Sequence, residues 1–261
     1  MILWNEKLTD LYRNNLNKYL GFTQELGVDK TFATFRLEAQ FESLKDWCQT
    51  GNIESKKAWF QEQKARCTMK VESIPLTQCR GWTVDEEVTH ESGEFFKIEG
   101  LRVTLSSSRE VKSGWDQPIL TQIGYDGGLL GIIRKSINGI PHYLLEAKAE
   151  PGNYGLTLLS PTLQATFSNL KKAHGGSKPK FSEYFETPEQ NNGEILFSQW
   201  MSEDGGRLHN KRNKGMIVQV PEDKDLEYPD SFQWFSLWQI KELISEDAWV
   251  NPHIRSIISH L

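Results

Sequence analysis

The sequence predicts an α+β fold: a mixed β-sheet flanked by helices and preceded by a helical N-terminal segment. Apolar residues recur at helical spacing in the first part of the chain, whereas residues 71–220 contain short β-like runs separated by Gly, Pro, Asn and Asp. Helical spacing returns after Ser236. We therefore divide the chain into a mostly helical segment, residues 1–70, and one sheet-containing module, residues 71–261.

The N-terminal segment shows the spacing of three helices. Residues 8–20 fit one short helix. A second helix is indicated by one apolar stripe: Leu37, Phe41, Leu44 and Cys48. Gly51-Asn52 predicts its end, and a third helix is expected from Ser55 to about Cys67.

Six runs in the following region have the composition of β-strands. They are residues 95–98, 102–105, 128–134, 142–150, 195–201 and 216–220. Asn138-Gly139 lies between the third and fourth runs, and this dipeptide is a strong signal for a two-residue hairpin. Asp126-Gly127-Gly128 predicts a further turn.

Three more helices are predicted toward the C-terminus. Ser160-Pro161 has the pattern of an N-cap with proline in the first helical position, and Gly175-Gly176 would end this helix. Its apolar face would be Leu163, Phe167 and Leu170. Ser236 and Gln239 have capping-box spacing at the start of the next helix. Asn251-Pro252 caps the last, which carries an apolar stripe to the final residue.

The composition and charge of the chain argue against several classes of protein. The net charge of −5 gives no basic field for nucleic acid. Three cysteines without CxxC spacing argue against a disulfide framework or a zinc site. No apolar run reaches the roughly 18 residues that span a membrane. The start, MILWNEKLTD, lacks the pattern of a signal peptide, so we expect a cytoplasmic protein.

The motifs of several common enzyme classes are missing from the sequence. There is no GxSxG, Walker, HExxH or strand-linked GxGxxG motif. The order of strands and helices would suit a Nudix-like fold. However, the segment between Ser160 and Gly175 contains no Asp or Glu, where a Nudix hydrolase has its carboxylate-rich metal helix. We therefore expect neither a bound metal nor metal-assisted diphosphate hydrolysis.

Residues 142–150 place ionisable side chains on one face of an expected strand, because side chains alternate between faces. The odd positions are apolar: Tyr143, Leu145, Ala147 and Ala149. The even positions are His142, Leu144, Glu146, Lys148 and Glu150. This face either lies in solvent or lines a pocket. In a pocket, Glu146 and Lys148 would pair an acid with a base, next to a Pro-Gly-Asn turn and the anion-binding helix start expected at Ser160.

Two other polar stretches are candidates for a site. In residues 202–214, two glycines allow a tight turn between Glu203 and the cations that follow, which can clamp a diphosphate. The alternative is a charged hairpin loop. Residues 89–96 contain His90 and Ser92 ahead of two phenylalanines, and a lone histidine of this kind is often structural or merely exposed.

Seven stretches together resemble the NDP-hexose 2,3-dehydratase family of deoxysugar biosynthesis. They are VESIPLTQCRGW (71–82), THESGEFFKIEGLRV (89–103), WDQPIL (115–120), GLLGIIRKSINGIPHYLLEAKAEPGN (128–153), LSPTLQATFSN (159–169), SEDGGR (202–207) and VNPHIRS (250–256). Each is short, but all occur in the family's order. The resemblance implies a Nudix-like fold without the metal chemistry.

The resemblance also implies a reaction, the loss of water across carbons 2 and 3 of a dTDP-4-keto-6-deoxy sugar. The 4-keto group acidifies the proton on carbon 3, a base removes it, and the enolate expels the carbon 2 hydroxyl with help from an acid. The 3,4-diketo-2,6-dideoxy product would pass to a downstream 3-ketoreductase. No nicotinamide, metal or other cofactor is implied.

Family members typically contain two copies of such a module, whereas this chain contains one. We infer that two chains associate as a homodimer and recreate the pair. Two rival functions are an epimerase or isomerase acting through the same enolate, and a non-catalytic subunit that binds nucleotide sugars.

Residue chemistry, rather than the family motifs, suggests the site residues. Beside the other motifs, the polar strand face is interpreted as a pocket wall, with Glu146 and Lys148 as the first candidates for proton transfer and His90 and Glu203 as the second. Trp115 would stack on thymine. The other substrate-binding candidates are Arg134 and Arg207 for the diphosphate, and Gln117, Asn153 and Gln164 for the sugar or the base.

Overall fold

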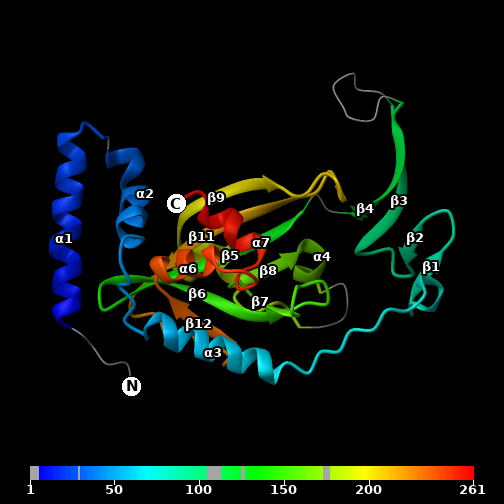
Figure 1. The fold of residues 1–261 in the computed structure, drawn as a ribbon. Coiled ribbons are helices and arrows are strands. Elements are labelled where there is room, and N and C mark those ends of the chain that lie inside the picture. The colour runs from blue at the N-terminus through cyan, green and yellow to red at the C-terminus, as the bar shows by residue number, and fades with distance from the viewer. Residues whose placement is uncertain (1–5, 29, 105–112, 125–126, 173–176) are drawn as a thin grey trace.

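A mixed seven-stranded sheet forms the centre of the molecule (Figure 1). The computed structural model describes residues 6–28, 30–104, 113–124, 127–172 and 177–261. The sheet has the order β12 (Phe232–Phe235), β6 (Ile140–Ala149), β5 (Gly128–Ile137), β11 (Arg212–Val220) and β9 (Glu194–Ser202). Two more strands extend it, because β7 (Thr157–Pro161) pairs with β6 and β8 (Leu163–Thr166) pairs with β5. Strands β5 and β11 are parallel and the other pairs are antiparallel.

The β5–β6 hairpin forms at the predicted dipeptide. Asn138 and Gly139 have φ angles of 52° and 73°. Two consecutive positive φ angles match the twist of the flanking strands, and Asn and Gly tolerate them better than other residues. The turn thereby fixes the register in which Ile137 pairs with Ile140 and Ile133 with Leu144.

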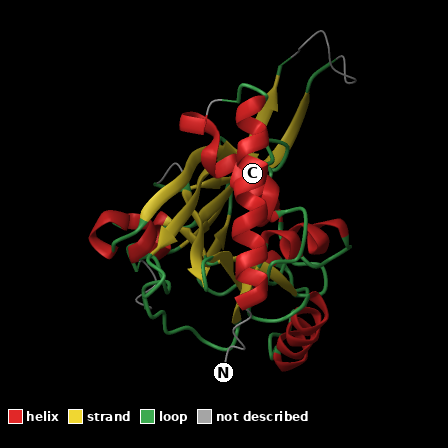
Figure 2. Cartoon of the chain, turned by 90° about the vertical axis from the view of Figure 1, so that its left-hand side faces the viewer, coloured by secondary structure: helices red, strands yellow, loops and turns green. Residues whose placement is uncertain are grey.

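Helices cover both faces of this sheet (Figure 2). On one face, Tyr143 and Leu145 of β6 belong to a core shared with α3 (Ile53–Arg66), α6 (Leu237–Ser245) and α7 (Pro252–Ile258). On the other, Leu144 belongs to a second core with α4 (Phe167–Leu170) and α5 (Glu183–Glu186). Because side chains alternate between the two faces of β6, this strand contributes residues to two separate cores.

A smaller five-stranded sheet forms an arm beside this body (Figure 1). Its order is β1 (Trp82–Val84), β2 (Val88–His90), β3 (Phe96–Val103), β4 (Trp115–Gln122) and β10 (Leu208–His209). Short 3-10 helices lie at Leu76–Gln78 and Pro188–Asn191. Because β10 lies in the connection between β9 and β11, this connection joins the arm to the central sheet.

The N-terminal helices α1 (Glu6–Glu25) and α2 (Lys30–Glu42) pack at the opposite end from the arm (Figure 1). A buried network attaches α2 to the sheet: Glu42 accepts hydrogen bonds from Arg134 Nη2 at 2.7 Å and from the Tyr143 hydroxyl at 2.8 Å. Burial opposes the charge on Arg134, but Glu42 and Tyr143 hold its pKa above the usual value. The guanidinium therefore remains a cation inside the protein.

The α+β class, with a mixed sheet flanked by helices behind a helical N-terminal segment, is confirmed. The capping box at Ser236 and the Asn251 cap are also confirmed. Of the predicted turn, Asp126 lies outside the described residues. No helix in the described part of the chain is long and apolar enough to cross a membrane.

The helix predicted from Ser160 is wrong. Ser160 and Pro161 end β7, and the chain continues as β8 before the single turn of α4. Residues 157–166 are instead held by ladders to β6 and β5, and tertiary pairing overrides the local capping pattern. The expected helix-start anion site at Ser160 is lost with it, and Gly175-Gly176 lies outside the described residues.

Smaller differences concern boundaries and short strands. Helix α2 ends at Glu42, before Leu44 and Cys48, and Asn52 caps the start of α3 instead of ending a helix. The strands β1, β2, β4, β7, β8, β10 and β12 were not predicted. Most are short, so their composition alone carries little signal.

The Glu42 network predicts a large effect on stability. In Glu42→Ala, Arg134 loses its buried partner, and the free energy of unfolding should fall by about 3–5 kcal/mol. Asp116→Ala is the control, because it breaks the exposed pair Arg102–Asp116 and should change the stability little. Urea denaturation measures both, and equal effects of the two substitutions would contradict the assigned role of Glu42.

Candidate active site

Strand β6 changes from buried to polar along its length. His142 and Leu144 are fully buried, whereas Glu146, Lys148 and Glu150 are half-buried. His142 does not join the charged residues, because its Nε2 accepts a hydrogen bond from the Gln49 backbone N–H at 2.8 Å near the α2–α3 connection. The face therefore lies neither in bulk solvent nor in a dry core, which is the setting that a polar pocket requires.

A hydrogen-bonded chain fixes the end of this polar face. Gln164 of β8 donates from Nε2 to Glu150 Oε1 at 2.9 Å and accepts from Asn251 Nδ2 at 3.0 Å. Asn251 is also the N-cap of α7, where its Oδ1 accepts from the Ile254 backbone N–H at 3.0 Å. Lys148 Nζ lies 3.8 Å from Glu150 Oε1 and donates to the Gln164 carbonyl at 3.4 Å. Three separate segments are thus held together.

A third carboxylate comes from the β9–β11 connection. Glu203 Oε1 accepts a hydrogen bond from Asn213 Nδ2 and lies 3.7 Å from Nδ1 of His253, which is in the first turn of α7. Both Glu203 and His253 are partly buried. We call the eight residues that meet here the polar cluster: Glu146, Lys148, Glu150, Gln164, Glu203, Asn213, Asn251 and His253.

Burial shifts the proton affinities of the polar cluster. It raises the pKa of Glu146, an effect that Lys148 opposes and Glu150 reinforces. It lowers the pKa of His253, although the negative charges of Glu203 and Glu150 work in the other direction. Glu146 is therefore a stronger base than an exposed carboxylate, and His253 is neutral at neutral pH.

A cavity of about 320 Å³ lies between the arm and the β9–β11 connection. Its lining residues are Lys97, Glu99, Thr121, Gln122, His209, Asn210 and Lys211. Lys211 connects the cavity to the polar cluster, because its ammonium donates to Gln122 and interacts with the charge of Glu203. Burial lowers the pKa of Lys211.

The polar cluster brings together four of the predicted site residues, Glu146, Lys148, Gln164 and Glu203. A fifth, Asn153, shapes the adjoining turn by donating from Nδ2 to the Leu156 carbonyl at 3.1 Å. The arrangement offers a base, a cation and hydrogen-bonding amides within one partly shielded region. Such a set suits proton abstraction next to a carbonyl group.

The other five predicted residues lie elsewhere. His90 is in β2 of the arm, where its ring packs edge-on against Trp82 and Phe95. Trp115 Nε1 donates to Gln117 Oε1 at 2.7 Å in β4, and Gln117 in turn donates to the Gly206 carbonyl. Arg207 is exposed and 3.4 Å from Asp204. Arg134 is enclosed in the Glu42 network, where it supports the fold.

Sequence reasoning missed His253, Asn251 and Asn213 as site residues. The motif VNPHIRS contained the first two, but there the asparagine was interpreted only as a helix cap. It serves as a cap and also bonds to Gln164. Among the described residues, no group of three or more His, Cys, Asp or Glu side chains is arranged to hold a metal ion.

Known sequences give a consistent match. The chain is 38% identical over 214 residues to the dTDP-4-dehydro-6-deoxy-alpha-D-glucopyranose 2,3-dehydratase of Amycolatopsis orientalis, covering 80% of this chain and 44% of the relative. The enzyme of the same description from Saccharopolyspora spinosa is 36% identical over 204 residues, 77% of this chain and 40% of the relative. The chain thus spans less than half the length of these relatives.

Solved structures give weaker matches. A Caenorhabditis elegans Ap4A hydrolase in a binary complex shares 13% identity at a TM-score of 0.31, covering 51% of this chain and 92% of that one. An ADP compounds hydrolase shares 12% identity at a TM-score of 0.35, covering 72% and 94%. Similarities this low carry no inference about activity.

The family match spans the whole sheet-containing part of the chain. It runs over residues 54–261 and includes every member of the polar cluster. The chain therefore belongs to the NDP-hexose 2,3-dehydratase family.

Proposed function

We propose that the chain is a nucleotide-sugar 2,3-dehydratase that acts on a dTDP-4-keto-6-deoxyhexose at the polar cluster. One observation carries the proposal within this family: four stretches far apart in the sequence converge there. EAKAEPGN supplies Glu146, Lys148 and Glu150, and SPTLQATFSN supplies Gln164. SEDGGR supplies Glu203, and VNPHIRS supplies Asn251 and His253.

Glu146 is the proposed base. Its pKa, which burial raises, strengthens the carboxylate as a proton acceptor. It takes the proton from carbon 3, and the electron pair of the broken C–H bond forms the enolate with the 4-keto group. Because the carboxylate is half-buried, less water competes for the proton.

Lys148 is the proposed acid. Its ammonium attracts the negative charge that develops on the substrate. When the enolate collapses, the bond between carbon 2 and its hydroxyl breaks, and a proton from Lys148 completes the departing water. The enol that remains becomes the 3,4-diketone, which a 3-ketoreductase would reduce. The neighbouring Glu150 holds the ammonium near the reacting face.

Product analysis tests the reaction. Purified protein is incubated with dTDP-4-keto-6-deoxyglucose and a 3-ketoreductase, and the expected product has lost the carbon 2 oxygen, as measured by mass spectrometry. A product that retains this oxygen would instead identify an epimerase or isomerase. Tight binding without turnover would identify a binding subunit.

Substitution of the proposed base separates catalysis from stability. Glu146→Gln should lower kcat/KM about a hundredfold or more. Burial raises the folded-state pKa of Glu146, so ionisation of this residue destabilises the fold as pH rises. At neutral pH, the free energy of unfolding of Glu146→Gln should therefore be equal to that of the wild type or higher. Lys148→Met should cause a similar loss of rate.

The control for Glu146→Gln is Glu194→Gln, an exposed position at the start of β9. It should leave kcat/KM unchanged. The wild-type rate should also fall as pH decreases through the raised pKa of Glu146. This decrease on the acidic side of the pH–rate profile should be absent from the residual activity of Glu146→Gln. Near-normal rates in both polar-cluster variants would move the active site elsewhere.

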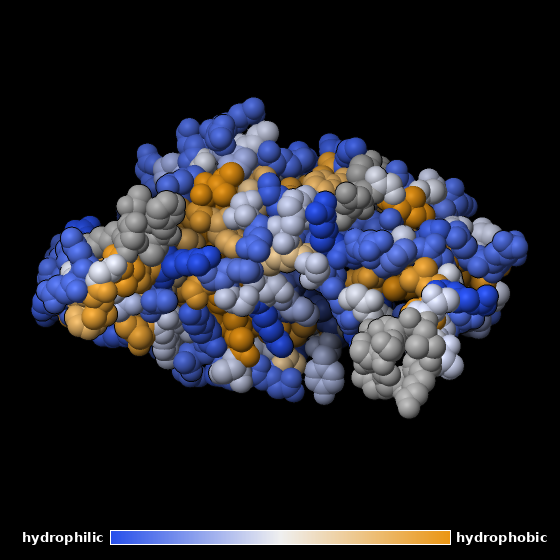
Figure 3. Space-filling model, turned by 90° about the horizontal axis from the view of Figure 1, so that it is seen from above, coloured by the Kyte–Doolittle hydropathy of each residue, from blue (hydrophilic) through white to orange (hydrophobic). Residues whose placement is uncertain are grey.

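We also propose that the chain forms a homodimer. Support comes from the arm, where Val84, Val88, Ile98 and Leu120 are paired in register across four strands, so that they share one face, and all are at least partly exposed. Figure 3 shows apolar surface among polar residues at the right-hand end of the molecule, where the arm lies. A second copy can cover this face.

Light scattering during gel filtration tests the assembly. A mass close to twice 30.1 kDa is expected at micromolar concentration. Ile98→Lys should shift the mass toward that of a monomer, because it places a charge on the apolar face, whereas Thr89→Lys on the opposite face of the same sheet should not. A monomeric wild type would refute the proposal.

A further inference from the structure

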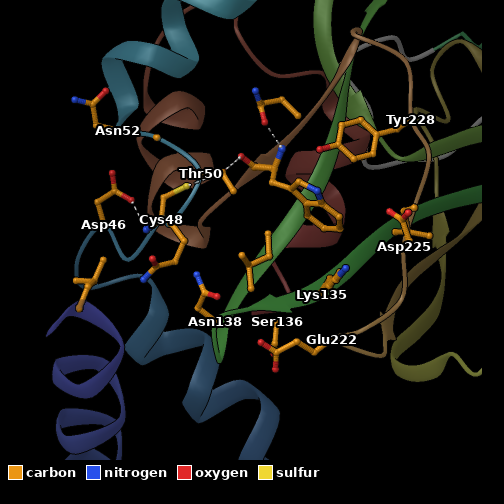
Figure 4. A pocket seen from close by; sticks show the side chains of 17 residues that line it. Asp46, Cys48, Thr50, Asn52, Lys135, Ser136, Asn138, Glu222, Asp225 and Tyr228 are labelled. Atoms are coloured by element: carbon orange, nitrogen blue, oxygen red, sulfur yellow. Dashed lines mark hydrogen bonds between the residues drawn. The ribbon is translucent and has the colours of Figure 1, made fainter. Parts of the chain in front are cut away.

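A second cavity, of about 910 Å³, lies at the other end of the central sheet (Figure 4). It is bounded by the α2–α3 connection, the β5–β6 hairpin, the start of β12 and residues 222–228. The volume lies in the range of small-molecule sites. None of its lining residues belongs to the polar cluster.

Strand β6 separates the two regions. The hairpin residues Ile137 and Asn138 line the cavity, and the polar cluster begins at Glu146. At about 3.3 Å per residue, the path from Ile140 to Lys148 spans roughly 26 Å. A ligand in this cavity is therefore not part of the substrate at the polar cluster.

The lining combines one accessible aromatic ring with many uncharged polar groups. Tyr228 is 39% exposed, and its ring lies edge-on to Trp234 with centroids 6.3 Å apart. Figure 4 shows the hydroxyl end of this side chain pointing toward the side of Thr50 and Cys48. The uncharged polar lining residues are Gln49, Thr50, Asn52, Ser136, Asn138 and Gln233.

Gln49 is the least satisfied of these residues. The residue is 8% exposed, and neither Oε1 nor Nε2 of its amide has a hydrogen-bond partner in the described protein. Leaving a buried donor or acceptor unpaired costs about 1–3 kcal/mol. Both amide atoms are enclosed by protein, so a ligand hydroxyl, itself both donor and acceptor, would pair with them once the side chain turned toward the cavity that it lines.

The charge of the lining argues against an anionic ligand. Three carboxylates, those of Asp46, Glu222 and Asp225, face a single ammonium, that of Lys135. This ammonium is already engaged, because it donates to the Lys224 carbonyl. Asp46 is used by the fold, since it accepts from Ser236 and Gln239. Glu222 and Asp225 thus leave a negative potential over the cavity.

We propose that this cavity binds a sugar ring that carries no phosphate, and that it binds an amine-bearing sugar most tightly. Tyr228 would stack on the apolar face of the ring, and the amides and hydroxyls around it would bond to the ring hydroxyls. Asp225 and Glu222 would attract an ammonium group. This site is separate from the dehydratase site and does not depend on the proposed reaction.

Saturation-transfer NMR with three probes tests the proposal. At millimolar concentrations, glucosamine should bind most tightly, methyl α-D-glucopyranoside less tightly and glucose 6-phosphate most weakly. Tyr228→Ala should weaken methyl α-D-glucopyranoside about fivefold, the scale of one aromatic contact. Asp225→Asn should reduce the preference for glucosamine over the methyl glycoside.

Lys148→Met is the control, because Lys148 lies in the polar cluster and not in this cavity, so its substitution should leave sugar binding here unchanged. Retained binding in Lys148→Met together with weakened binding in Tyr228→Ala supports the separate site. Thermal melts establish that both variants are folded. Absence of signal for all three probes, tightest binding of glucose 6-phosphate, or unchanged affinity in Tyr228→Ala would each overturn the proposal.

Discussion

The position of strand β6 in the middle of the sheet is the constraint on which the rest of the structure depends. One edge pairs first with β5 and then with β7, and the other pairs with β12. Pairing along both edges fixes the register, and a slip of one residue would exchange the two faces. Tyr143 and Leu145 would then leave their core, while Glu146 and Lys148 would enter it. The same pairing that stabilises the fold therefore determines on which face of the sheet the charged residues lie.

The charged end of β6 can be half-buried because other segments supply hydrogen-bonding amide groups to its carboxylates. A half-buried carboxylate or ammonium loses hydration, and the raised pKa of Glu146 reflects this loss. Gln164 and Asn251 compensate part of it for Glu150, and Asn213 does so for Glu203. These residues come from β8, α7 and β11, so the polar cluster forms only when the sheet and the last helix are assembled together.

How much of this was predictable differs from residue to residue. The alternation of residues 142–150 and the Asn138-Gly139 turn are local signals, and both lead to the correct strand and hairpin. Ser160-Pro161 shows where local signals fail, since the pairing partners that make it a strand lie elsewhere in the sequence. His253 and Glu203 could not be paired from their spacing, because their contact depends on how α7 crosses the sheet. Arg134 looked like a diphosphate ligand because its partner, Glu42, is 92 residues away.

The proposed pairing of two modules would affect the two parts of the structure differently. Every member of the polar cluster comes from one chain, so on the proposed assignment the acid, the base and their supporting amides need no residue from a second copy. The arm is the part with the weaker core: of its apolar residues, Ile119 is the one counted as buried in the described chain. Burial of apolar surface is what stabilises a sheet of this size. Pairing of modules would therefore stabilise the arm and the cavity beside Lys211, and it would affect substrate binding more than the proton transfers at β6.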